Sequence, residues 1–291
     1  MFWVYLALRI LANPLSNVAQ KRLTREQAHP LFVVGLTHLG LSLVCAPWLI
    51  CNWPSVGWEF WINIAVSAVL ALSANLLIVH ALSRSDLSYL GPINAYKSVV
   101  SLLPGFLWLH EVPAKLQLAG IGLILAGSYL IVDRDPVAGQ PVTRFRFWGD
   151  RAVHLRLGGL VLSAIEAVFL KRALALSDPV TTFAIWTCAG GCVFLGVVCV
   201  RGGKDVNRQW PIFVQHRQTL AGLVLTTGLM QLSTLVILSG LPVAPVLALF
   251  QTSNLLTVVL GRQVFGEPQF TRRMLGSAIM AAGAVFIILA D

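Results

Sequence analysis

Apolar runs long enough to cross a lipid bilayer recur along the whole chain, and this feature limits the fold more than any other. A membrane-spanning helix needs about 20 mostly apolar residues. Soluble domains are about 25% charged, whereas only 11% of these 291 residues are Asp, Glu, Lys or Arg. The mean hydropathy is +0.78. These residues cannot form the polar surface of a soluble protein, so the sequence predicts an all-α, polytopic membrane protein.

Ten membrane-spanning helices are expected, mostly with short linkers. They cover residues 2–20, 30–50, 58–81, 87–109, 114–132, 154–175, 179–200, 217–238, 242–263 and 271–290. A polar linker, 134–152, separates a first half, 1–133, from a second half, 153–291. An even number of spans places both termini on the same side of the membrane.

The two halves resemble each other in sequence. A shift of 156 residues superimposes Glu111, Gly120 and Gly127 on Glu267, Gly276 and Gly283. The two glycines of each half are seven residues apart on one helix face, which predicts close helix packing. A shift of 150 residues superimposes Lys21-Arg22 on Lys171-Arg172. Chance similarity between apolar helices is the alternative explanation. Because five helices per half is an odd number, a duplication would give inverted repeats, with a binding site between the halves near the midplane.

The glutamate after the fourth and ninth spans, followed by glycines nine and sixteen residues later, resembles the EamA group of the drug/metabolite transporter superfamily. Lys21 and Lys171, which close the first span of each half, fit the same pattern, whereas His110 replaces the usual glycine before Glu111. The resemblance covers nearly the whole chain. It implies two inverted five-helix repeats and a secondary transporter of amino acids or related organic solutes, often an exporter. It also implies a multi-pass protein of the cell membrane, here the bacterial inner membrane. An exchanger of phosphorylated or nucleotide-linked metabolites is the alternative.

Polar side chains recur at helical spacing within five of the predicted spans, so each set lies on one helix face. The sets are Arg9, Asn13 and Asn17; Asn94, Lys97, Ser98 and Ser101; Ser163 and Glu166; Thr227, Gln231 and Thr234; and Gln251 and Asn254. Asn75 adds an amide from the third span. Polar groups at membrane depth usually face the bundle interior or a wet cavity. We therefore predict a central substrate site, although single Ser and Thr residues are more typical of hydrogen bonds between helices.

Three ionisable residues are expected deep within the spans: Arg9, Lys97 and Glu166. The ammonium of Lys97 is a compact charge that suits a carboxylate or phosphate, and it resembles the phosphate-binding lysine of triose-phosphate translocators. Glu166 is the predicted proton-coupling residue, since intramembrane carboxyl groups often relay protons. A structural Lys97–Glu166 ion pair is the alternative. Glu111 and Glu267, at span ends, are expected to accept hydrogen bonds from backbone or loop donors.

Motifs for other chemistry are absent from the sequence. It has no P-loop and no hydrolase or metalloprotease motif, so we expect neither a cofactor nor an enzyme; a membrane transferase and a non-transporting receptor are the weaker alternatives. Cys188 and Cys192 share a helix face without a His or carboxylate partner, so no metal site is expected, and the thiols should be buried. The expected partners are a small-molecule substrate and the lipid bilayer, without nucleic acid, for a monomer or homodimer.

The orientation in the membrane receives two opposed predictions. Linkers after odd-numbered spans, counted together with the adjoining span ends, hold 16 Lys and Arg residues, and those after even-numbered spans hold 3. Because basic residues favour the cytoplasmic side, this count places both termini outside the cytoplasm. The family resemblance implies that both termini lie inside.

Overall fold

The fold is entirely helical in the part of the chain that the computed structural model describes, which is residues 2–94, 96–97, 100, 115–131, 149–201, 204–241 and 243–288. The helices of the first half are α1 (Phe2–Arg25), α2 (Pro30–Cys51), α3 (Trp58–Leu82), α4 (Leu87–Ile93) and α6 (Lys115–Ile131). Those of the second half are α8 (Arg151–Leu174), α9 (Pro179–Arg201), α10 (Lys204–Gln215), α11 (Arg217–Gly240), α12 (Val243–Leu249), the 3₁₀ helix η1 (Phe250–Thr252), α13 (Ser253–Phe265) and α14 (Phe270–Ile288).

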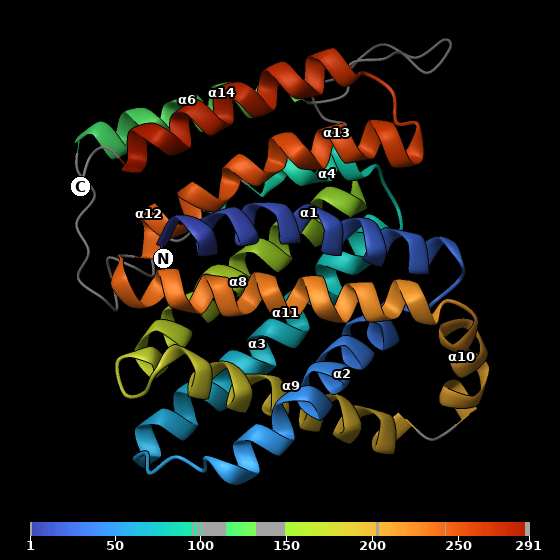
Figure 1. The fold of residues 1–291 in the computed structure, drawn as a ribbon. Coiled ribbons are helices and arrows are strands. Elements are labelled where there is room, and N and C mark those ends of the chain that lie inside the picture. The colour runs from blue at the N-terminus through green and yellow to red at the C-terminus, as the bar shows by residue number, and fades with distance from the viewer. Residues whose placement is uncertain are drawn as a thin grey trace.

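Five of these helices, α2, α3, α8, α9 and α11, are each long and apolar enough to cross a membrane. The prediction of an all-α, multi-pass protein is therefore confirmed, while the full count of ten spans stays a prediction. In Figure 1, α1 begins and α14 ends at the same end of the bundle, as an even number of spans requires.

Local sequence signals define several helix ends. The side chain of Asp150 accepts a hydrogen bond from the Ala152 N–H at 2.8 Å and so caps the start of α8. His29 does the same for α2, where Pro30 occupies the first turn. At the other end of a helix, Gly266 has a φ of +67°, the left-handed conformation that glycine adopts without strain, and this ends α13.

The helices pair in a way that follows the sequence repeat. Helix α1 packs on α11, and α3 packs on α8, while α2 pairs with α9 and α6 with α14. If α1, α2, α3 and α6 correspond to α8, α9, α11 and α14, the α1–α11 pair is equivalent to the α8–α3 pair. The α2–α9 and α6–α14 pairs are each formed by two equivalent helices. Figure 1 shows the α6–α14 pair side by side at one edge of the bundle.

Glycines allow the α6–α14 pair to approach closely. A Cβ atom on Gly127 would lie 2.7 Å from the carbonyl oxygen of Gly276, and one on Gly283 would lie 2.5 Å from that of Gly120. The 156-residue shift superimposes Gly127 on Gly283 and Gly120 on Gly276, so the two contacts are equivalent in the two repeats. The prediction that these glycines serve close helix packing is confirmed.

Three details of the predicted layout are wrong. The ninth span is not one continuous helix, because η1 separates α12 from α13. Residues 204–215, expected within a linker, form the amphipathic helix α10, which buries Phe213 and exposes Trp210. The cysteines are exposed or only half-buried, because the lipid-facing surface of a span is as apolar as its interior, and hydrophobicity alone does not separate the two.

Candidate functional site

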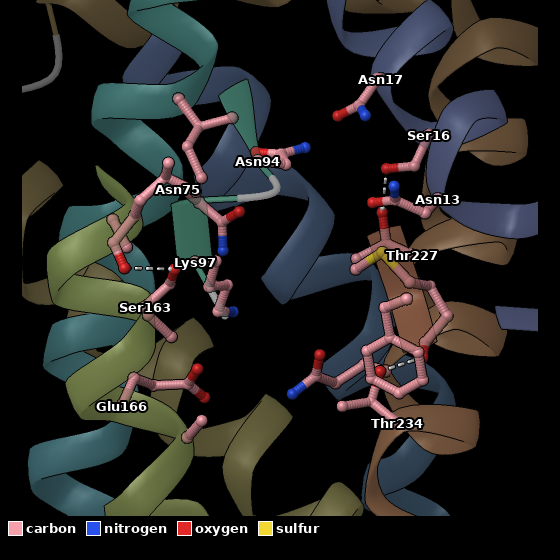
Figure 2. Close-up of a pocket in the computed structure, with 18 of the residues that line it drawn as sticks. Asn13, Ser16, Asn17, Asn75, Asn94, Lys97, Ser163, Glu166, Thr227 and Thr234 are labelled. Carbon is pink, nitrogen blue, oxygen red and sulfur yellow. Dashed lines mark hydrogen bonds between the residues drawn. The ribbon is translucent and has the colours of Figure 1, made fainter. Parts of the chain in front are cut away.

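A polar cavity of about 140 Å³ lies between the two halves. Its polar lining consists of Arg9, Asn13, Ser16, Asn17, Gln20, Thr37, His38, Asn75, Asn94, Lys97, Arg156, Ser163, Glu166, Trp186, Thr227, Gln231, Thr234 and Ser253. Figure 2 shows two facing walls. Side chains of α1 and α11 form one wall, and side chains of α3, α8 and the segment after α4 form the other.

The structure brings together eight of the ten charged and amide residues predicted for the site. They are Arg9, Asn13, Asn17, Asn75, Asn94, Lys97, Glu166 and Gln231, and they come from α1, α3, α8, α11 and the segment after α4. Asn254 is fully buried in α13 but does not line the cavity. Gln251 lies in η1, and its side chain is outside the described part of the structure, as are Ser98 and Ser101.

The cavity lies where the fourth helix of each half is broken. Helix α4 ends at Ile93, and Asn94 forms a turn in which its N–H bonds to the Gly91 carbonyl, 3.0 Å away. The Lys97 N–H then bonds to the Asn94 carbonyl at 2.9 Å. These i→i+3 bonds match the 3₁₀ geometry of η1. The 156-residue shift superimposes Asn94 on Phe250 and Lys97 on Ser253, so both repeats break at equivalent positions beside the cavity.

Hydrogen bonds between distant segments hold the α1–α11 wall. The hydroxyls of Ser16 and Thr227 lie 3.1 Å apart, and Asn13 donates to the Ser253 hydroxyl at 3.0 Å. Arg9 donates from Nε to the Thr234 hydroxyl at 2.8 Å, while its guanidinium lies 4.4 Å from the centre of the Phe250 ring. The expectation that Ser and Thr residues bond between helices is confirmed here.

Glu166 and Lys97 lie on the opposite wall and do not form an ion pair. Glu166 is buried, and its Oε1 accepts a hydrogen bond from the Ser67 hydroxyl at 3.3 Å. Among the residues described, no hydrogen bond or salt bridge joins Lys97 to Glu166, although the two attract each other electrostatically. Figure 2 shows both side chains directed into the space between the walls. The alternative of a structural ion pair is therefore wrong for this conformation.

Arg156 is a cavity residue that sequence reasoning missed. It lies near the start of the predicted sixth span and was counted with the basic residues of the linker before it, but α8 already begins at Arg151, and the Arg156 side chain is only 1% exposed. Its Nε and Nη1 atoms have no hydrogen-bond partner in the described part of the chain. A helical signal was available, because Arg156 is seven residues before Ser163 and thus continues the same face. Among the described residues, the cavity lining therefore carries three cationic side chains and one carboxylate.

A second polar cluster, which we call the terminal ion cluster, lies at the end of the bundle where α1 finishes. It consists of Lys21, Asp86, Ser88, Glu267 and Arg273. Lys21 donates to Glu267 Oε1 at 2.7 Å and to the Ser85 carbonyl at 3.0 Å. Arg273 donates to the Ser88 hydroxyl and, at 3.1 Å, to Asp86.

Glu267 is the centre of the terminal ion cluster. Its carboxylate also accepts the N–H groups of Leu87 at 2.8 Å and Ser88 at 2.6 Å, in the first turn of α4. The prediction that Glu267 satisfies backbone donors is confirmed, whereas Glu111 lies outside the described residues. Burial raises the pKa of Glu267, but hydrogen bonds from Lys21 and Ser88 outweigh this effect, so the pKa lies below its ordinary value of 4.5.

A related contact occurs in the second half. Lys171 donates to the Leu241 carbonyl at 3.0 Å, as Lys21 does to the Ser85 carbonyl. Lys171 follows Lys21 by 150 residues and Leu241 follows Ser85 by 156, the two shifts that align the halves in sequence. The lysine that closes the first helix of each half thus fixes the start of the fourth.

Comparison with known proteins gives one family. The model of the EamA-like transporter family matches residues 3–133 and 151–289. No protein among the curated proteins matches this chain. A solved structure described only as "Crystal structure of protein" is similar over 98% of this chain and 97% of its own length, with a TM-score of 0.61 and 13% identity. At that identity the similarity shows the fold alone.

Proposed function

Because the chain belongs to the EamA-like transporter family of the drug/metabolite transporter superfamily, whose members are membrane transporters rather than enzymes, we propose that it is a secondary transporter of small anionic metabolites. The observation that carries this proposal is the charge of the described cavity lining, where Arg9, Lys97 and Arg156 accompany one carboxylate, Glu166. Cationic side chains in a membrane interior are costly unless they are paired. A substrate carboxylate or phosphate would supply the missing partner.

The broken helices support alternating access as the mechanism. Transporters built from inverted repeats commonly bind substrate at discontinuous helices near the midplane, and one repeat moves against the other around that site. Here the break after α4 and the break at η1 both border the cavity. Backbone groups released by such breaks remain available to a ligand in a polar cavity.

The size of the cavity helps to rank the candidate substrates. Sites for drug-sized ligands occupy about 300–1,000 Å³, whereas this cavity measures about 140 Å³. Amino acids and related small organic acids are therefore the first candidates. Small phosphorylated metabolites are second, because a guanidinium fork binds phosphate as well as carboxylate. Nucleotide-linked metabolites are disfavoured by their size.

The proposal is tested by measuring flux through the purified protein in proteoliposomes. Efflux and counterflow should be measured for small carboxylates, small phosphate esters, neutral sugars and cationic drugs at matched concentrations. We expect flux for the anions, absent from protein-free vesicles. Flux restricted to neutral or cationic solutes would contradict the proposal of an anion transporter. Absence of flux for every class of solute would contradict a transport function.

Replacing Glu166 with glutamine is expected to abolish the dependence of flux on an imposed pH gradient. Protonation of Glu166 removes a negative charge from the cavity and so favours an anion, and by reciprocity the bound anion favours the proton. Proton and anion would then move together. The measurement is initial flux with and without a pH gradient, and Glu59→Gln, at an exposed position in the first turn of α3, is the control. Glu166→Gln flux that still follows the gradient would exclude this role.

This linkage also bears on the direction of transport. An anion that moves with protons enters the cell along an inward proton gradient, whereas the family resemblance favours export. If the anionic substrate is exported instead, transport would proceed by exchange for another solute, without proton coupling at Glu166. We place the transporter in the cell membrane, as in a bacterial inner membrane, as a monomer or homodimer without cofactor or catalytic activity.

A further inference from the structure

We propose that the cavity selects elongated dianions, small molecules with an anionic group at each end, and that Arg156 binds one of the two groups. This inference rests on the proposed function and names its substrate class. Dicarboxylates are the simplest members of the class. Phosphorylated carboxylates share its chemistry, whereas simple phosphate monoesters carry both charges at one end.

The first support is the balance of charge. With Glu166 ionised, the three cations of the cavity lining leave two positive charges without a compensating carboxylate among the residues described. Lys97 lies close enough to both arginines to be repelled by each of them. A monoanion compensates one of these charges, and a dianion compensates both. Because uncompensated charges in a low-dielectric interior are strongly unfavourable, charge balance favours the dianion.

The second support is unused hydrogen-bonding capacity on both arginines. Arg156 has no hydrogen-bond partner for Nε or Nη1 in the described part of the chain, and its side chain is almost fully buried. Arg9 uses Nε for Thr234, but its Nη1 likewise lacks a partner there. Each guanidinium therefore keeps N–H donors of the kind that pair with the two oxygens of a carboxylate.

The third support is the position of the two arginines at opposite ends of the cavity. Arg156 precedes Glu166 by ten residues, which corresponds to about 15 Å along α8. Figure 2 shows Glu166 below Ser163 on α8. Arg156 precedes Ser163 by seven residues, so the helix places it about two turns from Ser163, on the side away from Glu166. Thr234, which binds Arg9, lies at the lower end, across from Glu166. Lys97 lies between these levels, so the cations form a row along the cavity rather than one cluster.

The experiment compares matched anions on the purified full-length protein. Glutarate is the dianion, its monoamide glutaramate is the monoanion of nearly equal shape, and glycerol phosphate carries both charges at one end. We expect the wild-type protein to bind glutarate at least about tenfold more tightly than glutaramate, as one additional charged hydrogen bond gives. Equal affinities for the two, or tighter binding of glycerol phosphate than of glutarate, would overturn the proposal.

The Arg156→Gln variant locates this selectivity. The ratio of glutarate to glutaramate affinity should fall to about one, while the affinity for glutaramate changes little. Arg172→Gln, on the exposed face of the same helix, is the matched control and should keep the wild-type ratio. If a folded Arg156→Gln protein keeps the wild-type ratio of glutarate to glutaramate affinity, Arg156 does not bind the substrate. If this variant does not fold, Arg156→Lys, which keeps the charge without the planar fork, should show a reduced ratio.

The outcomes separate this inference from the proposed function. Equal, Lys97-dependent binding of both acids would leave an anion transporter without selectivity for dianions. If neither acid binds or moves, the proposed function fails as well.

Discussion

Substitution of Lys97 by methionine should lower the affinity for the transported anion at least about 100-fold and reduce flux to the level of protein-free vesicles. Lys97 lies at the break in the fourth helix and interacts electrostatically with Arg9, Arg156 and Glu166, so it contributes to the potential along the whole cavity. Removing one partner of a desolvated charge pair costs about 2–5 kcal/mol. A loss of about 2.7 kcal/mol corresponds to 100-fold in affinity. The measurements are ligand titration and proteoliposome flux.

The same substitution should not weaken the protein without ligand. In the empty cavity, burial of the Lys97 charge and its repulsion by both arginines together outweigh its attraction to Glu166, so methionine should leave the melting temperature unchanged or raise it. Residues kept for binding often lower stability in this way. Lys115→Met, at an exposed position in α6, is the control for the loss of a lysine. Wild-type flux by Lys97→Met would exclude Lys97 from the site, and a lower melting temperature would indicate a structural role.

The second large effect is expected at Glu267, where glutamine should destabilise the folded protein by about 3–5 kcal/mol. The side chains of Glu267 and Lys21 are 2% and 5% exposed. The substitution therefore leaves a buried ammonium whose nearest remaining carboxylate, in the part of the chain that the structure describes, is Asp86 at 4.0 Å. An amide also replaces one of the oxygens that accept the Leu87 and Ser88 N–H groups. For a chain of this size the melting temperature in detergent should fall by roughly 10 °C.

Comparison with Glu59→Gln isolates the effect of the terminal ion cluster, since Glu59 is exposed.

The stabilisation by Glu267 should depend on pH in a defined direction. Because folding lowers the pKa of Glu267, its stabilisation is complete above about pH 4.5 and is lost as the pH falls through the folded-state pKa. The difference in melting temperature between wild type and Glu267→Gln should therefore shrink on acidification below pH 4.5. A constant difference would mean that ionised Glu267 does not stabilise the fold.

Helical spacing was sufficient to predict most of the cavity lining. Asn13 and Asn17 are four residues apart, so both follow Arg9 onto the face of α1 that meets the cavity. The cost of polar groups in lipid makes such a face point inward. The duplicated Gly-x₆-Gly pattern similarly predicted the close approach of α6 and α14. Asn254 shows the limit of this reasoning, because it lies one position beyond Ser253 and faces away from the cavity.

Other features depend on interactions that a linear pattern does not contain. Arg156 is close to a predicted span end, where a basic residue usually reaches the aqueous interface, and only the tertiary position of α8 keeps it inside the bundle. The break at Phe250–Thr252 coincides with the polar residues 251–254, of which Gln251 and Asn254 were interpreted as one face of a continuous helix. Helix α10 was not predicted, because its mixed composition resembles that of a linker. Its apolar residues form one face only when they are arranged with helical periodicity.

The broken fourth and ninth helices also imply an unequal carrier. Their backbone breaks are duplicated, but their chemistry has diverged, since Lys97 in one repeat corresponds to Ser253 in the other. If the two repeats were chemically identical, a carrier in which they exchange roles would present the same surface to both sides of the membrane. Here the charged segment belongs to one repeat only, so the solute meets a different wall from each side. We therefore expect different apparent affinities at the two membrane faces, and a bound molecule that crosses with one fixed end leading.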